Sequence, residues 1–164
     1  MTEPVFISIK LLFILGFTLH NMEEAVWFPK WSVNAKKYLR PVSSNEFIFA
    51  GIVLTVFGYI LTALNLLFNN HGNILNYIYI GFVGMIGLNS LFPHLITTIL
   101  IKKYSPGLIT GICLNLPLSI IITAEYLNTS INLYKLIISI IIVSGAILLS
   151  LKNLFKLGKY LFNC

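Results

Sequence analysis

The chain has 164 residues, of which 57% are hydrophobic and only 10% are charged. Soluble domains carry about 25% charged residues, so this composition excludes an ordinary soluble domain and indicates an all-α, multi-pass protein of the cell membrane. The formal net charge of +6 falls in the connections between apolar segments, and it therefore indicates no nucleic-acid partner. We expect a single integral membrane domain over residues 1–164.

Five apolar segments are long enough to cross a bilayer, which takes about 20 residues in a helix. Their approximate bounds are 5–27, 47–68, 77–101, 107–127 and 134–151. The residues around Ser43 and Glu46 predict a capping box at the start of the second helix. Ser105 and Pro106 predict an N-cap serine followed by a first-turn proline at the start of the fourth.

Basic residues predict the orientation of these five helices. The first and third connections and the C-terminal tail lie on one side of the membrane, and Lys135 is the one base near the other side. By the positive-inside rule the N-terminus is therefore outside and the C-terminus cytoplasmic. Lys10 lies within the first span. The nine of eleven bases on the predicted cytoplasmic side are Lys30, Lys36, Lys37, Arg40, Lys102, Lys103, Lys152, Lys156 and Lys159.

The first span ends in an ionisable cluster. Glu23 and Glu24 follow His20 by three and four positions, so the three side chains share one face of a helix. A charge at the centre of a membrane helix costs about 2.5–3.5 kcal/mol, and such residues usually face the bundle interior and carry a function. The alternative is that the cluster lies among lipid headgroups and only ends the helix.

Two later spans carry polar residues at the same predicted depth. Helical spacing from Trp27 and from Lys102 places His20 and His94 roughly 10–12 Å below the cytoplasmic interface, and Asn115 reaches a similar level. We therefore expect the first four helices to surround a polar pocket, with the fifth at the periphery. We also expect the His94 ring within about 6 Å of the Glu23 or Glu24 carboxylate, near enough for a shared metal or a bridging water.

This set of donors suits a divalent metal such as zinc, iron or manganese. A bound metal acidifies water, which then attacks a lipid ester or phosphate. No other cofactor is expected. The predicted metal ligands are His20, Glu23, Glu24 and His94, the predicted catalytic residues are Glu23 and Glu24, and the predicted substrate-binding residues are Asn89, Tyr104, Thr110 and Asn115.

Other functions use the same residues. Without a metal, a glutamate beside a histidine is a general acid/base pair for a polyprenyl or sterol-like substrate. A proton-coupled transporter or a small-molecule binding protein would use the buried carboxylates as proton carriers, and a non-catalytic structural protein is a third class. The expected partners are membrane lipid and a lipid-like or small apolar molecule. The sequence leaves open the oligomeric state and the roles of His71 and Glu125.

The motif residues resemble those of a known family. His20, Glu23 and Glu24 match the motif for which the HXXEE family of small bacterial membrane proteins is named. The resemblance covers roughly residues 10–127 and implies a shared site without naming its reaction. A looser likeness to five-helix sterol-isomerase-like proteins is a fold-level analogy. Further positions that look like recurrent family residues are Asn89, His94, Tyr104, Pro106, Gly107, Thr110 and Pro117.

Overall fold

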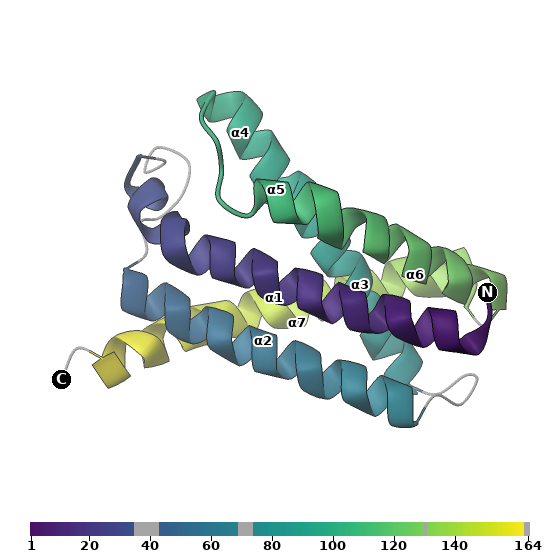
Figure 1. Ribbon diagram of the computed structural model, residues 1–164. Coiled ribbons are helices and arrows are strands. Elements are labelled where there is room, and N and C mark those ends of the chain that lie inside the picture. The colour runs from purple at the N-terminus through teal and green to yellow at the C-terminus, as the bar shows by residue number, and fades with distance from the viewer. Residues whose placement is uncertain (35–42, 69–73, 130, 163–164) are drawn as a thin grey trace.

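The computed structural model describes residues 1–34, 43–68, 74–129 and 131–162. Over these ranges the regular structure is helical throughout and includes no strand, which confirms the predicted all-α class (Figure 1). The helices are α1 Glu3–Asn34, α2 Ser44–Leu67, α3 Ile74–Asn89, η1 Ser90–Leu95, α4 Ile96–Ile101, α5 Leu108–Thr110, η2 Gly111–Asn115, α6 Leu116–Thr129 and α7 Leu133–Phe162. The elements η1 and η2 are π-helical turns within longer helical stretches.

Five helical stretches are long and apolar enough to cross a membrane, and each overlaps one predicted span. Helix α1 continues past its predicted end at Trp27 to Asn34, and α7 continues past Leu151 to Phe162. The remainder of the first connection, from residue 35 to residue 42, lies outside the described residues, as does His71. The stretches are Glu3–Val33, Ser44–Leu67, Ile74–Ile101, Leu108–Thr129 and Leu133–Phe162.

Aromatic packing explains why the first and last helices are longer than expected. Phe28 of α1 stacks on Phe47 of α2 with ring centroids 4.7 Å apart. Phe47 in turn faces Phe155 of α7 at 6.4 Å. The extended ends are therefore held by contacts between helices, which hydropathy along a single segment does not reveal.

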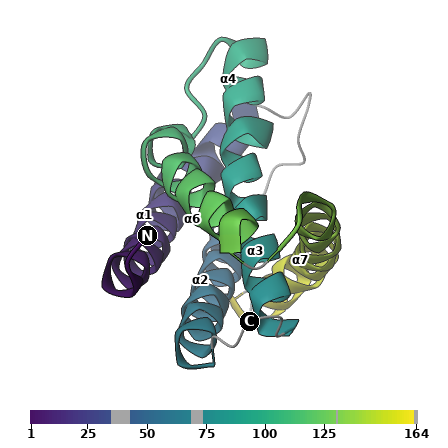
Figure 2. The same ribbon diagram turned by 90° about the vertical axis from the view of Figure 1, so that its right-hand side faces the viewer.

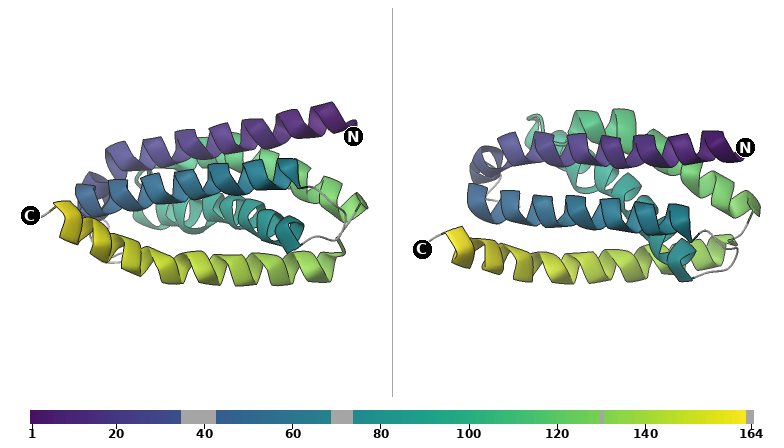
Figure 3. Two further views of the ribbon diagram at one scale, coloured as in Figure 1. Left: turned by 90° about the horizontal axis from the view of Figure 1, so that it is seen from below. Right: turned by 60° about the horizontal axis from the view of Figure 1, so that its bottom comes forward.

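The chain runs back and forth along the bundle. Helices α1, α2 and α7 lie side by side over most of their length, and the two chain ends lie at opposite ends of the bundle (Figure 3). Helix α3 lies between α6 and α7. Helix α4, which follows α3 in the chain, extends away from the bundle (Figure 2). The arrangement brings the C-terminal half of α1 next to α5 and η2.

Helix α7 is the least buried of the five apolar stretches, which fits the predicted peripheral position, yet it packs closely against α3. A Cβ atom added at Gly81 of α3 would lie 2.5 Å from the backbone oxygen of Ser139, and one at Gly84 would lie 2.5 Å from the side chain of Ile140. Small residues of this kind let membrane helices approach each other closely. The last helix thus supports α3, the helix that leads to His94.

The third span bends immediately before His94. Phe92 has non-helical backbone angles (φ −130°, ψ 118°) and precedes Pro93, which lacks the N–H group that a regular helix needs. The π-helical turn η1 contains this break and packs against η2 of the fourth span. Gly111 makes that contact possible, since a Cβ atom there would lie 3.0 Å from Ser90 Oγ.

One predicted helix cap is confirmed and the other is wrong. Ser43 Oγ accepts a hydrogen bond from the Glu46 backbone at 3.3 Å, and the Glu46 carboxylate accepts one from the Ser43 backbone at 3.0 Å. Ser105 does not cap the fourth span, because the N-cap position belongs to Gly107 and carries no side-chain bond. The Ser105 hydroxyl lies instead 3.5 Å from Nδ1 of His94.

An aromatic layer fills the centre of the bundle. The rings of Phe17, Phe57 and Phe13 meet Phe82 edge to face at centroid distances of 5.3, 5.9 and 6.2 Å. Phe13, Phe17 and Phe82 are almost fully buried. On α1 this layer occupies the turns between Lys10 and His20.

Candidate functional site

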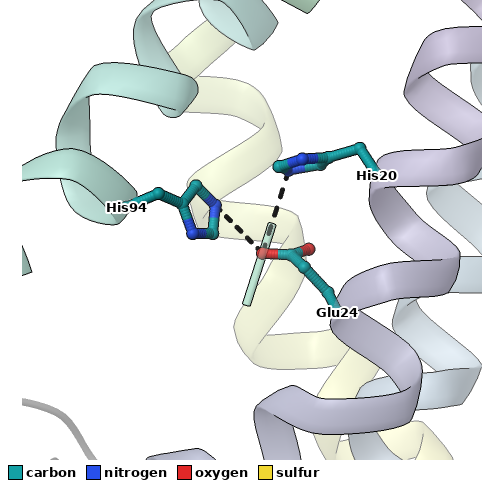
Figure 4. Close-up of side chains that lie close together, drawn as sticks. All are labelled: His20, Glu24 and His94. Carbon is teal, nitrogen blue, oxygen red and sulfur yellow. Dashed lines mark ion pairs between the residues drawn. The ribbon is translucent and has the colours of Figure 1, made fainter. Parts of the chain in front are cut away.

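Three potential metal ligands converge between α1 and the bent third span (Figure 4). His94 Nε2 lies 3.0 Å from Glu24 Oε1, and His20 Nε2 lies 3.9 Å from the same oxygen. One donor atom from each of the three residues lies within 4.8 Å of the other two. The predicted contact between the His94 ring and a motif carboxylate is therefore confirmed for Glu24.

The site is buried. The His20 and His94 side chains are each 1% exposed, and that of Glu24 is 15% exposed. The two rings stand nearly perpendicular, at 87°, with their centroids 5.0 Å apart. A carboxylate in such surroundings needs a compensating partner, and two imidazole nitrogens are the groups that face it.

Each imidazole presents one nitrogen to the centre and the other to a hydroxyl group. The Asn89 amide nitrogen lies 3.3 Å from His20 Nε2 and 3.2 Å from His94 Nε2. On the opposite edges, His20 Nδ1 lies 3.2 Å from Thr110 Oγ1 and His94 Nδ1 lies 3.5 Å from Ser105 Oγ. Metal-binding histidines show this pattern, with the second ring nitrogen bonded to a protein acceptor.

The turn before α5 covers both imidazoles and requires glycine. Gly107 has φ of +90°, a left-handed conformation that residues with a side chain rarely adopt. A Cβ atom at this position would lie 2.8 Å from His20 Cε1, 2.9 Å from His94 Cε1 and 3.1 Å from Glu24 Cγ. The backbone of the turn therefore forms one wall of the site.

Glu23 lies apart from the three potential ligands and binds the start of the fourth span. Its Oε1 accepts hydrogen bonds from the Gly107 N–H at 2.7 Å and from the Tyr104 hydroxyl. Its Oε2 accepts from the Thr110 hydroxyl at 2.6 Å and from the Thr110 N–H at 3.3 Å. A glutamate on one helix thus satisfies N–H groups at the beginning of another, where a local cap would normally act.

Tyr104 titrates later than an ordinary tyrosine. Partial burial raises its pKa to about 12, and the hydrogen bond to the Glu23 carboxylate also favours the protonated phenol. The Tyr104 hydroxyl is therefore a hydrogen-bond donor across the physiological pH range.

The predicted substrate-binding residues fall in three places. Asn89 lies at the centre of the site, whereas Tyr104 and Thr110 contact Glu23. Asn115 is fully buried against Gly16 of α1, one turn before His20, and its side-chain oxygen and nitrogen have no hydrogen-bond partner. Their substrate-binding role stays a prediction.

The two adjacent glutamates face two different hollows. A cavity of about 170 Å³ is lined by Glu24 and Asn89 and otherwise mainly by apolar side chains of α1, α2, α3 and α7. A groove of about 810 Å³ runs along the other side of α1, where Glu23, Tyr104 and Thr110 line it. The cavity on the Glu24 side is the one that reaches the group of potential ligands.

A second buried polar cluster lies towards the opposite end of α1. Lys10 is 1% exposed, and its ammonium group donates to Asn65 Oδ1 at 2.7 Å and to the Tyr126 hydroxyl at 3.1 Å. It also lies 4.4 Å from the centre of the Phe6 ring, and Asn65 donates to Asn76 at 2.9 Å. The sequence interpretation assigned Lys10 no role, although a lysine within an apolar span was itself a signal of a buried site.

Comparison with known proteins agrees with the motif. Residues 11–122 match the model of a family described as "Protein of unknown function with HXXEE motif". The chain is also 45% identical to the "Uncharacterized protein YrkK" of Bacillus subtilis (strain 168) over 147 residues, which cover 89% of this chain and 92% of that protein. No solved structure matches.

Replacing Gly107 by alanine tests the wall of the site. We expect Gly107→Ala to lower the free energy of unfolding by about 1–3 kcal/mol, because the added methyl group meets both imidazoles and the left-handed backbone becomes strained. Thermal unfolding in detergent, followed by circular dichroism, measures the effect. Gly145→Ala in α7 is the matched control, since nothing lies within 4 Å of its added Cβ atom. Equal losses in the two variants would contradict the described position of the turn.

Proposed function

The chain belongs to the HXXEE family, which is defined by its motif and has no established reaction, and we propose that it is a membrane-embedded metalloenzyme acting on a lipid-like substrate. The observation that carries the proposal is the convergence of His20, Glu24 and His94 on one buried point beside an apolar cavity. Ionisable groups inside membrane helices are costly, and they usually mark a functional site.

The proposed metal site consists of two imidazole nitrogens and one carboxylate oxygen. Nitrogen and oxygen donors suit zinc, iron or manganese, and three protein ligands with an open position are typical of catalytic zinc sites. A divalent cation there would supply a hydroxide nucleophile at neutral pH and polarise a carbonyl or phosphoryl oxygen. Glu24 serves as the carboxylate ligand and Asn89 orients the bound group. Glu23 is left out because both of its oxygens already accept hydrogen bonds from the turn.

The proposed substrate has a hydrocarbon chain and a polar ester or phosphate end. The cavity beside Glu24 and Asn89 supports this, because its remaining lining is largely apolar and includes Phe17, Phe82, Met85, Ile86, Ile147 and Phe155. A segment of an acyl or isoprenoid chain would lie among these side chains, with its polar end at the ligands.

The proposed orientation puts this site on the cytoplasmic side of the cell membrane, with the N-terminus outside. Support comes from the positive-inside rule. Lys30 lies near the end of α1, Lys102 and Lys103 follow α4, and Lys152 lies in the second half of α7. The C-terminal ends of these three helices lie at one end of the bundle (Figure 1).

Metal binding is the first test. We expect the protein purified in detergent to bind Zn²⁺ at one site, measured by titration calorimetry and by elemental analysis. His20→Ala, His94→Ala and Glu24→Gln each remove a ligand, so each should weaken binding by more than the roughly 10–100-fold typical of residues that only support a ligand. His71→Ala, which removes the third histidine of the chain, is the matched control. Binding that survives all three ligand variants would contradict the proposed site.

A change in membrane lipids is the second test. Cells that lack the protein should accumulate a lipid species that disappears when the wild-type protein is restored but persists with Glu24→Gln. Comparison of lipid extracts by mass spectrometry measures this difference. Identical extracts from all strains would contradict an enzyme acting on a membrane lipid.

A proton-coupled transporter is the second candidate function, and the Lys10 cluster favours it. Buried ionisable groups at two depths, His20 with Glu24 and Lys10 with its neutral partners, are what a protein that moves protons across a membrane needs. Uptake into proteoliposomes that depends on a pH gradient, and that Glu24→Gln abolishes, would support transport over the enzyme.

Cysteine labelling tests the orientation. In a background with Cys113 and Cys164 replaced by serine, Lys103→Cys and Phe68→Cys each place one exposed thiol at opposite ends of the bundle. A membrane-impermeant maleimide added to intact cells should label only Phe68→Cys. Permeabilised cells should label both variants, which controls for reactivity. Labelling of Lys103→Cys in intact cells would overturn the proposed orientation.

A further inference from the structure

We propose that Glu23 and Thr110 form a positioning pair that fixes the proton of the His20 ring on Nδ1 and so leaves the Nε2 lone pair facing the Asn89 amide at the centre of the site. The proposal deepens the metal site and rests on it for its functional meaning, but the ring state itself is a property of the metal-free protein. Glu23 thereby becomes a positioning residue that acts through Thr110 on one ligand.

The first step is the direction of the hydrogen bonds. A threonine hydroxyl carries a single proton and can donate only one strong hydrogen bond, whereas a carboxylate oxygen can only accept. Thr110 Oγ1 lies 2.6 Å from Glu23 Oε2, which is its shortest contact with an acceptor, and 3.2 Å from His20 Nδ1. The hydroxyl proton therefore goes to Glu23, and the Thr110 oxygen is left as an acceptor facing the imidazole.

The second step is the state of the ring. For His20 Nδ1 to bond an oxygen that accepts, Nδ1 must carry the hydrogen. A neutral imidazole then has its lone pair on Nε2, the nitrogen that lies 3.3 Å from the Asn89 amide nitrogen, which donates. The arrangement resembles the carboxylate–histidine pairs of metal sites, with a hydroxyl group inserted between carboxylate and ring.

The third step is the rigidity of the carboxylate. Backbone N–H groups only donate, and those of Gly107 and Thr110 hold the two Glu23 oxygens at 2.7 and 3.3 Å. The residue is 8% exposed, and its carboxylate borders the groove along α1. Glu23 therefore keeps its position as an acceptor whichever group occupies the centre of the site.

The two histidines differ in this respect. His94 Nδ1 faces Ser105 Oγ at the longer distance of 3.5 Å, and no carboxylate hydrogen bond to that hydroxyl is found among the described residues. In the metal-free protein His94 Nε2 lies 3.0 Å from Glu24 Oε1, an oxygen that only accepts, so the same reasoning places the His94 hydrogen on Nε2, the opposite nitrogen from that of His20. Of the two motif carboxylates, Glu24 is thus a ligand of the proposed site, and Glu23 orients the first histidine, His20.

Nitrogen NMR of isotope-labelled histidine tests the proposal in the metal-free protein. Only three histidines are present, so His71→Ala and His94→Ala assign the His20 signals. We expect the wild type to show His20 protonated on Nδ1, and Thr110→Val, which removes the hydroxyl group, to shift the population towards Nε2–H. Thr110→Ser should restore the wild-type signals. Thr123→Val is the matched control, since that hydroxyl donates only to backbone oxygens.

A second variant keeps the test decisive if Thr110→Val fails to fold. In Glu23→Gln the amide can donate to the Thr110 oxygen, which frees the hydroxyl proton for His20 Nδ1 and predicts protonation on Nε2. Zn²⁺ affinity should fall roughly 10–100-fold in Thr110→Val and recover in Thr110→Ser. An unchanged Nδ1–H signal in both Thr110→Val and Glu23→Gln would overturn the positioning pair. Absence of Zn²⁺ binding in the wild type would instead contradict the proposed function, and the tautomer result would stand by itself.

Discussion

The structure depends on the separate accommodation of two adjacent carboxylates inside an apolar bundle. Glu23 and Glu24 follow one another on α1, yet one accepts hydrogen bonds from the turn before α5 and the other faces two imidazoles. Two charges this close are tolerable only when each has its own donors. The contacts of Glu23 hold the start of the fourth span against α1. The contact of Glu24 with His94 holds the bent third span against the same helix.

Irregular backbone is what brings these partners into place. The break at Phe92 directs His94 towards α1, and the glycine turn at Gly107 lets backbone N–H groups reach Glu23 while leaving room for both rings. Non-helical backbone at membrane depth is normally tolerated only where protein covers it or where it lines a cavity. Here η1 and η2 contact each other, and Ser90 and His94 of η1 are buried, whereas Phe92 at the break is exposed.

Patterns along the chain predicted the helices and one contact, but not the division of roles. Hydropathy identified the five apolar stretches, and helical spacing with depth predicted that His94 meets a motif carboxylate. Spacing could not distinguish Glu23 from Glu24, because both lie on one helix face and the choice depends on a turn far along the sequence. The cap assigned to Ser105 failed for the same reason, since a glutamate from another helix satisfies that helix start. The partners of Lys10 come from α2 and α6. Local sequence patterns do not predict which helices pack together, so these partners could not be predicted.

The aromatic layer around Phe82 separates the two polar levels of the bundle. Lys10 and its amide and phenol partners lie on one side of it, and His20 with Glu24 lies on the other. The rings themselves carry no hydrogen-bonding group, and Asn115, buried against Gly16 on the same stretch of α1, is a polar side chain between the two levels. A proton-coupled function would therefore require water or a side-chain rearrangement at the level of these rings.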